Sequence, residues 1–324
     1  MRSFSCDTCG QLVFFENTIC LRCRSDLGFE PRRRELVTLS PGAARCANLE
    51  LAGCNWLVDT KGDLCASCVL TRTRPADDDA EGIERFRDAE AAKRWLLFEL
   101  GELGLPVQSW RQREGGLAFE LLSSERGTVT TGHADGVVTL DVAESDDAHR
   151  EALRERLGEP YRTVLGHFRH EIAHYYWPLL VPDGPGRERF RALFGDERED
   201  YGAALERHYE SGAPFDWSER FVSAYATMHP WEDWAETFAH YLHIWDTLQT
   251  AGAFGVNVRG AEDPAPDGGD VRELLDDWLP LTYALNALSR SMGRDDLYPF
   301  VLPAPVVEKL AFVHERVTAA SRRG

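Results

Sequence analysis

The sequence contains few lysines and few methionines, with three of each among 324 residues. It lacks any stretch of about 18 consecutive apolar residues, so we expect no transmembrane helix and no membrane partner. The opening residues MRSFSCDTCG lack a charged segment followed by an apolar run, which predicts no signal peptide and a cytoplasmic location. Disorder of the whole chain is excluded, because 43% of the residues are hydrophobic and 10% are aromatic.

Basic residues are scarce relative to acidic ones, but only in one part of the chain. The sequence has 36 Lys and Arg against 54 Asp and Glu, which gives a net charge of −18. Residues 1–75 contain 10 basic and 8 acidic side chains, and residues 76–324 contain the remaining 26 and 46. Because an acidic surface repels phosphate backbones, we do not expect residues 76–324 to bind nucleic acid. The length predicts one main domain and a smaller module.

Cysteine is absent from the last 256 residues, and all eight cysteines lie near the N-terminus. The first four form two C-x2-C pairs separated by ten residues: Cys6, Cys9, Cys20 and Cys23. Two such pairs can place four thiolates tetrahedrally around one Zn²⁺. Gly10 and Arg24 follow the pairs at positions where a zinc knuckle turns. We therefore predict a four-cysteine zinc ribbon over residues 1–36.

The other four cysteines predict a second four-cysteine zinc-binding segment over residues 37–75, although their first spacing is irregular: Cys46, Cys54, Cys65 and Cys68. In a reducing cytosol a disulfide framework is the weaker alternative, and rubredoxin-like iron is weaker still. Two functions remain open for the ribbons. The zinc ions can replace a hydrophobic core that a short segment cannot build, or the ribbons, with Arg32, Arg33 and Arg34, can recruit a protein or nucleic-acid partner.

Residues 76–324 predict an α+β domain that is mostly helical. Short β-rich runs separated by turn signals lie between residues 117 and 142 and predict a small antiparallel sheet. Residues 260–270 are rich in Pro, Gly and Asp and predict an exposed loop. Helices are predicted over residues 83–103, 148–157, 160–177, 230–249, 271–292 and 306–319, and the third of these is expected to stop at Pro178.

An HExxH sequence lies inside the predicted helix 160–177. His170 and His174 are at positions i and i+4, so both project from one face and can share a metal, while Glu171 can reach a water bound to that metal. Apolar residues occupy the opposite face of the helix, which is typical of a helix between a core and a cleft. A metzincin is excluded, because Trp177 and Leu180 stand where that class needs Gly and His.

A third metal ligand is predicted 58 residues after His174, on the helix 230–249. Glu232 and Glu236 begin a polar stripe on an otherwise apolar helix, and buried carboxylates require partners. Zinc on Glu232 and an imidazole N–H on Glu236 would satisfy both. Asp233 is the alternative ligand. The remaining histidines of interest are expected to pack, form hydrogen bonds or shape a turn rather than bind metal: His133 with Asp135, His167, His240 and His243.

The HExxH helix followed by Glu232-x3-Glu236 resembles a gluzincin of the lethal-factor type. That resemblance implies that Glu232 binds zinc, that Glu236 orients a ligand histidine, and that Tyr225, seven residues before Glu232, supports the oxyanion. The whole chain resembles a bacterial family of zinc-binding metallopeptidases with an N-terminal zinc ribbon. The matching stretches are RCANLELAGCNWLV, LDVAESDDAHREALRERLGEPYRTVLGHFRHEIAHYYW, FGDEREDYGAALERHY and SAYATMHPWEDWAETFAHYLHIWDTLQTA.

These features predict a zinc metallopeptidase that hydrolyses a peptide bond, with one catalytic and two structural Zn²⁺. Zinc-activated water would attack the carbonyl, Glu171 would act as general base and Tyr225 would stabilise the oxyanion. The run 137–142 is the expected strand for pairing with an extended peptide or protein substrate. One alternative is a non-catalytic zinc scaffold whose ribbons bind protein or nucleic acid, and another is a hydrolase of a non-peptide amide.

Overall fold

The computed structural model describes residues 1–146, 163–258 and 270–322. The chain forms two compact units, one of Met1–Leu100 with Val107–Phe168 and one of Gly101–Pro106 with Arg169–Gly324. This grouping differs from the predicted segments 1–36, 37–75 and 76–324, because the first long helix belongs to the same unit as the cysteine-rich residues. Among the described residues, no helix has both the length and the apolar character needed to cross a bilayer.

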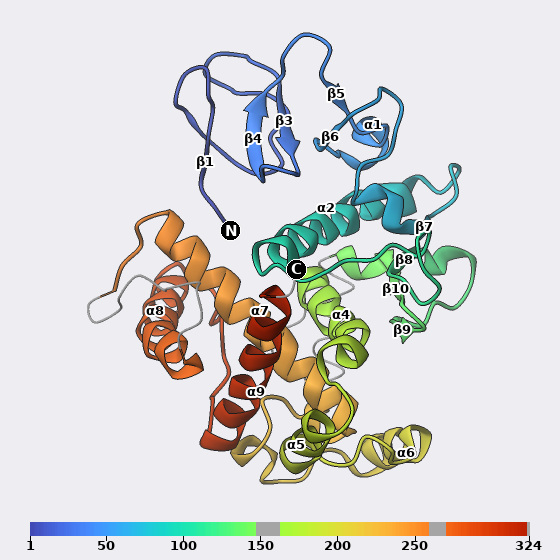
Figure 1. The fold of residues 1–324 in the computed structure, drawn as a ribbon, viewed down its shortest axis with the longest axis vertical. Helices are drawn as coiled ribbons and strands as arrows, with labels where there is room; N and C mark the ends of the chain where they lie inside the picture. The colour runs from blue at the N-terminus through green and yellow to red at the C-terminus, as the bar shows by residue number, and fades with distance from the viewer. Residues whose placement is uncertain (147–162, 259–269, 323–324) are drawn as a thin grey trace. The chain divides into compact units, whose positions relative to one another are not determined.

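Short antiparallel ribbons build the cysteine-rich part (Figure 1). Three two-stranded sheets pair β1 with β2, β3 with β4 and β5 with β6. Strands of two to four residues cannot bury much apolar surface, which is consistent with a fold that depends on bound metal. The elements are β1 (Phe4–Ser5), β2 (Leu12–Val13), β3 (Leu27–Glu30), β4 (Glu35–Thr38), β5 (Ala44–Arg45), α1 (Leu49–Ala52), β6 (Leu57–Val58) and η1 (Cys68–Leu70).

Helix α2 (Ala80–Glu102) completes the core of the cysteine-rich part. Phe98 of α2 is 2% exposed, and its ring lies 5.3 Å from the ring of Phe15 and 5.8 Å from that of Phe29. Phe4 contacts the same rings. Residues 1–75 therefore share one aromatic core with α2. The predicted boundary at residue 75 lies between α2 and the residues that α2 packs against.

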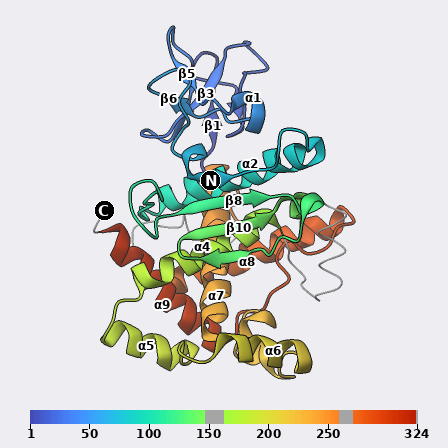
Figure 2. The same ribbon diagram turned by 90° about the vertical axis from the view of Figure 1, so that its right-hand side faces the viewer.

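A four-stranded sheet follows in the first unit, in the order β7-β8-β10-β9. The strands are β7 (Thr71–Thr73), β8 (Ala118–Leu122), β9 (Gly132–Ala134) and β10 (Val137–Asp141). The sheet is mixed: β7 and β10 each pair with β8 in parallel, and the expected antiparallel pairing occurs in the β9–β10 hairpin (Figure 2). Asp135 (φ 49°) and Gly136 (φ 83°) form the left-handed turn of that hairpin.

The run 137–142, predicted to pair with an extended substrate, forms β10, and the sheet leaves little of this strand open to another chain. Hydrogen-bonded neighbours lie on both of its edges, since β8 pairs along its whole length and β9 pairs with residues 137–139. The tight Asp135-Gly136 turn folds β9 back onto the edge that a peptide would need. The edges of this sheet are instead β7 and β9.

The second unit consists of helices. The first of them, α4 (Val164–Leu180), begins in the first unit, and from Arg169 onward it belongs to the second unit. The helices that follow α4 in the described residues are α5 (Pro185–Phe194), α6 (Tyr201–Ser211), α7 (Pro230–Ala253), α8 (Val271–Ser291) and α9 (Ala304–Ser321). The predicted helices over residues 83–103, 230–249, 271–292 and 306–319 are confirmed by α2, α7, α8 and α9, whereas α5 and α6 are additional. The predicted helix 148–157 and most of the predicted loop 260–270 lie outside the described residues.

Helix α4 (Val164–Leu180) carries the HExxH sequence and extends two residues beyond Pro178. The predicted stop at Pro178 is therefore wrong. Proline removes the N–H that would bond to the carbonyl one turn earlier, but it does not end the turn. The next turn still closes, because the Val181 N–H donates to the Trp177 carbonyl at 2.9 Å.

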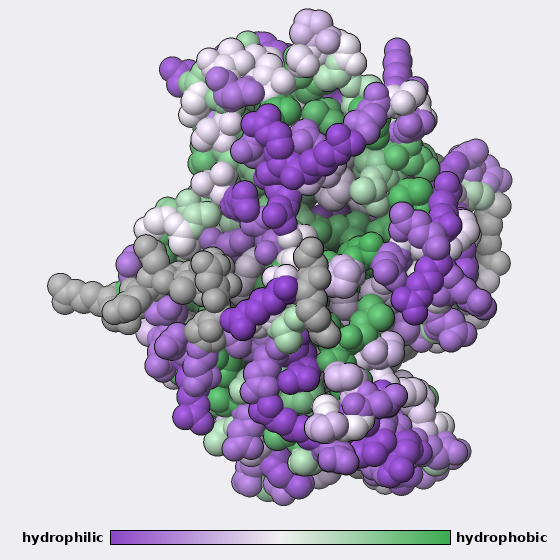
Figure 3. Space-filling view, viewed as in Figure 1, coloured by the Kyte–Doolittle hydropathy of each residue, from purple (hydrophilic) through white to green (hydrophobic). Residues whose placement is uncertain are grey.

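Aromatic side chains fill the core of the second unit around Trp234 of α7. Its ring contacts Phe190 and Phe194 of α5 and Phe312 of α9, and its Nε1 donates to the Ala173 carbonyl of α4 at 2.9 Å. These contacts fix α7 against α4. The face of the molecule drawn in Figure 3 is mainly hydrophilic, in line with the burial of the apolar residues. The predicted α+β class, mostly helical with an N-terminal zinc-ribbon region, is confirmed.

Candidate metal centres

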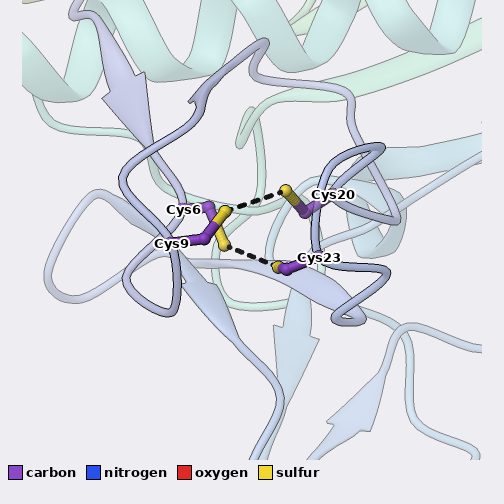
Figure 4. Close-up of side chains that lie close together, drawn as sticks. All are labelled: Cys6, Cys9, Cys20 and Cys23. Carbon is purple, nitrogen blue, oxygen red and sulfur yellow. Dashed lines mark hydrogen bonds between the residues drawn. The ribbon is translucent and has the colours of Figure 1, made fainter.

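The first four cysteines converge on one point, with their sulfurs within 4.8 Å of one another (Figure 4). Cys6 and Cys23 are 3.6 Å apart between sulfurs, and so are Cys9 and Cys20. Zn–S bonds of about 2.3 Å in a tetrahedron place sulfurs about 3.8 Å apart, so the spacing suits Zn²⁺. The residues after the two pairs, where turns were predicted, have left-handed backbone: Gly10 (φ 69°) and Arg24 (φ 64°).

The second four cysteines form a fully buried cluster, also within 4.8 Å: Cys46, Cys54, Cys65 and Cys68. The Cys54 and Cys65 sulfurs are 3.5 Å apart, far longer than a disulfide bond of about 2.05 Å. All eight cysteines are free thiols, so the disulfide alternative has no support. Hydrogen bonds from Cys54 and the other two thiols hold the pKa of Cys46 well below its ordinary value. The pKa values of the other three thiols are raised, so the cluster holds one thiolate readily, and zinc binding would release the protons of the other three.

A buried ion pair lies beside this second cluster. Glu90 of α2 is 3.7 Å from the Cys68 sulfur and 2.5 Å from Lys93, and both charged side chains are fully buried. Arg94 lies 3.8 Å from the other oxygen of Glu90 and donates to the Ala52 carbonyl. The two cations offset the negative charge that four thiolates and a carboxylate bring into the interior.

A third group forms where α4 and α7 meet. His170 and His174, one helical turn apart on α4, converge with Glu232 of α7, and their ligand atoms lie within 4.8 Å. Glu232 Oε2 is 2.9 Å from His170 Nε2, and Glu232 Oε1 is 3.6 Å from His174 Nε2. These separations bracket the value of roughly 3.3 Å expected between tetrahedral neighbours at metal distances of about 2.0–2.1 Å. Two imidazoles and one carboxylate are a donor set that suits zinc.

Glu236, one turn after Glu232, binds the other nitrogen of His170. Its Oε1 is 2.7 Å from His170 Nδ1, so Nδ1 carries the proton and Nε2 is the nitrogen directed at Glu232. Burial acts to lower the pKa of His170, but the hydrogen bonds to Glu232 and Glu236 outweigh it and hold that pKa well above its ordinary value. Burial opposes ionisation of Glu232, yet its hydrogen bonds with His170 and His174 keep its pKa well below the usual range.

Asp233, the alternative third ligand, is directed away from the two histidines. Its Oδ2 accepts from Lys309 of α9 at 2.6 Å, and both side chains are nearly inaccessible. Burial raises the pKa of Asp233 to about 7, although Lys309 acts in the opposite direction. Of the two neighbouring carboxylates, only Glu232 lies with the histidines.

The two predicted catalytic residues, Glu171 and Tyr225, also lie near the potential metal ligands of α4 and α7. Glu171 is 9% exposed on α4, and its charge acts on Tyr201. The ring of Tyr225, in η5 (Tyr225–Thr227), lies 6.0 Å from the ring of His170. Burial, with the charge of Glu232 and the neighbouring Tyr201, raises the pKa of Tyr225 well above its ordinary value. The phenol therefore keeps its proton at neutral pH.

Tyr201 is the site residue that sequence reasoning missed. Its hydroxyl donates to Glu232 Oε1 at 2.9 Å from the first turn of α6. No spacing rule relates Tyr201 to the HExxH sequence, and α6 itself was not predicted. The only signal was its place within the family stretch FGDEREDYGAALERHY.

The other histidines lie where structural roles were expected. His240 Nδ1 is 2.7 Å from the Tyr298 hydroxyl, and His243 Nδ1 is 3.4 Å from Arg169. His167 Nδ1 is 2.5 Å from Glu144, within the first unit. His133 accepts from the Gly136 N–H in the β9–β10 turn. None of these four belongs to the groups of potential metal ligands among the described residues.

Comparison with known proteins finds two matching family models. A family described as "Putative zinc-binding metallo-peptidase" matches residues 82–316, and a family described as "zinc-ribbon domain" matches residues 3–79. Uncharacterized proteins of Mycobacterium bovis and Mycobacterium tuberculosis are 54% identical over 322 residues, covering 97% of this chain and 94% of theirs. No solved structure matches the chain.

Proposed function

Because the chain belongs to the family of putative zinc-binding metallo-peptidases, we propose that it is a zinc-dependent peptidase that hydrolyses a peptide bond. One observation carries the proposal. His170 and His174 meet Glu232 within 4.8 Å across two helices, while Glu236 binds the second nitrogen of His170. Three ligands leave a fourth position for water, as catalytic rather than structural zinc sites do.

In this proposal His170, His174 and Glu232 hold the catalytic ion. Zinc bound by such a set supplies a Lewis acid that polarises a carbonyl and acidifies water. Glu236 keeps the proton on His170 Nδ1, so that Nε2 offers its lone pair to the ion. The four residues thus form a preorganised site on two packed helices rather than on loops.

Glu171 and Tyr225 are the proposed catalytic residues. Glu171, next to His170 on α4, takes a proton from water and returns it to the leaving amine. Tyr225 is held neutral by burial and by the charge of Glu232, so its hydroxyl can donate to the oxyanion that forms from the substrate carbonyl. Removing one such donor from comparable enzymes costs about 2.7–4 kcal/mol of transition-state stabilisation.

The two four-cysteine clusters are proposed to hold structural zinc, one ion each. All eight cysteines pack in or against the aromatic core of Phe4, Phe15 and Phe29, so metal and core form one folding unit. A protein partner for the ribbons is compatible with this role, since Arg32 and Arg33 have exposed side chains.

Metal analysis and one conservative substitution test the proposal. We expect three zinc ions per wild-type chain and two in His170→Ala/His174→Ala. Glu171→Gln should retain three ions and lose cleavage of a mixed peptide library, whereas Glu188→Gln, on the exposed face of α5, should match wild type. A wild-type chain with two ions would contradict the metal site. A Glu171→Gln variant that cleaves at the wild-type rate would remove Glu171 as the base and favour a scaffold role.

A further inference from the structure

The start of α6 is built to present one side chain to the metal ligands. Asp200 caps the helix, since its carboxylate accepts from the Ala203 N–H at 2.8 Å. The cap places Tyr201 at the first helical position, and its hydroxyl reaches Glu232 Oε1 at 2.9 Å. Glu232 is 2% exposed, and the Tyr201 hydroxyl is the group within hydrogen-bond distance of its Oε1, since His174 Nε2 lies farther away, at 3.6 Å. Loss of a hydrogen-bond donor from a buried oxygen is costly.

The starts of α6 and α7 are also joined by the side chain of His229. His229, the N-cap of α7, accepts from the Trp231 N–H through Nδ1 at 3.1 Å. Its Nε2 is 3.1 Å from the Glu199 carbonyl, so the neutral ring carries its proton on Nε2 and donates there. The Tyr201 ring lies 5.3 Å from the His229 ring. Tyr201 is therefore held in place by the residue that precedes the helix bearing Glu232.

The two oxygens of Glu232 have different partners. Oε2 is 2.9 Å from His170 Nε2, whereas Oε1 accepts from Tyr201 at 2.9 Å and lies 3.6 Å from His174 Nε2. A carboxylate with both oxygens free can rotate between one-oxygen and two-oxygen ligation. A donor fixed on Oε1 restricts that rotation and leaves Oε2 directed toward His170.

We propose that Tyr201 is a positioning residue of the metal site, which holds Glu232 Oε1 so that Oε2 is presented to the ion. This inference rests on the proposed function, because it takes Glu232 as a zinc ligand. It also gives α6 a role: the helix brings a second phenol to a site otherwise built from α4, α7 and η5. Outer partners of ligand residues commonly change metal affinity by about 10–100-fold when they are removed.

The test measures zinc affinity in the intact protein, with Tyr201→Phe and the control Tyr283→Phe. Tyr283 lies on α8, and its side chain is 76% exposed. Each variant is loaded with zinc and titrated with a chelator, and the loss of the third zinc is followed while the cysteine-bound ions remain in place. We expect Tyr201→Phe to lose that ion at least about tenfold more readily than wild type, with Tyr283→Phe unchanged.

Thermal unfolding of the chelator-treated proteins separates positioning from folding. A merely structural role for Tyr201 would lower Tm without changing the affinity for the third zinc. Equal zinc affinity in wild type and Tyr201→Phe would overturn the inference and leave the peptidase proposal intact. A wild-type protein that never binds a third zinc would overturn both, and that result is visible before any variant is made.

Discussion

The hydrogen bond between Glu236 and His170 predicts that two substitutions of Glu236 weaken zinc binding to different extents. Its 2.7 Å length and its carboxylate acceptor, whose side chain is 20% exposed, identify a charge-assisted bond, which is worth about 1.5–3 kcal/mol. Glu236→Gln keeps an oxygen in place but removes the charge, and neutral bonds are about half as strong. Glu236→Ala removes the acceptor altogether, so the partly buried His170 Nδ1–H loses its hydrogen-bond partner.

These losses translate directly into zinc affinity. We expect about a fivefold weaker third zinc site in Glu236→Gln, from roughly 1 kcal/mol, and a decrease of about 10–100-fold in Glu236→Ala. Chelator competition on the zinc-loaded protein measures both, with Glu206→Ala on the exposed face of α6 as the control. If Glu236→Ala retained its third zinc as tightly as wild type, the view that Glu236 orients the ligand histidine would be refuted.

Three further predictions concern stability, each measured by urea unfolding of the zinc-loaded protein. Phe98→Ala should destabilise the unit that contains the cysteine clusters by about 3–5 kcal/mol, because the Phe98 ring fills the core shared with the ribbons. A loss below about 1 kcal/mol would show that α2 and the ribbons pack independently. Lys309→Met should cost about 3–5 kcal/mol, since it leaves Asp233 buried without its cation; an unchanged midpoint would contradict that pairing. Burial lowers the pKa of His240 to about 4, below the ordinary value of 6.5, so its contribution to stability is present above pH 6.5 and is lost as the pH falls toward 4. His240→Gln should flatten this part of the pH profile, and an identical slope would exclude His240 as its source.

The parts of the fold that follow short-range rules could be predicted from the sequence. The C-x2-C pairs, the HExxH helix and the Glu232-x3-Glu236 helix each bring side chains together within one or two turns of chain, so spacing alone indicates the chemistry. The convergence of α4 with α7 did not follow from spacing. It was inferred because two carboxylates on an apolar helix require partners, and the geometry of Glu232 and Glu236 follows that reasoning.

The features that escaped prediction depend on contacts distant in sequence. The parallel pairing of β8 with β10 is determined by β9, which folds back through the Asp135-Gly136 turn and takes the other edge. Helix α6 has a weak apolar pattern, because its exposed residues dominate and only Ala204 is buried. Tyr201 could not be assigned without α6. The packing of Phe98 against the cysteine-rich part likewise depends on partners that precede it by about seventy to ninety residues of chain.

The placement of the few lysines has a practical consequence for handling the protein. All three lie within the described residues, and two of them, Lys93 and Lys309, are enclosed in ion pairs with side-chain exposures of 0% and 5%. Lys61 is exposed, in the turn between Cys54 and Cys65. Among the three lysines, an amine-reactive dye or crosslinker should therefore attach to the folded chain at Lys61. That selectivity offers a defined attachment point beside the second cysteine cluster without any substitution in the sequence.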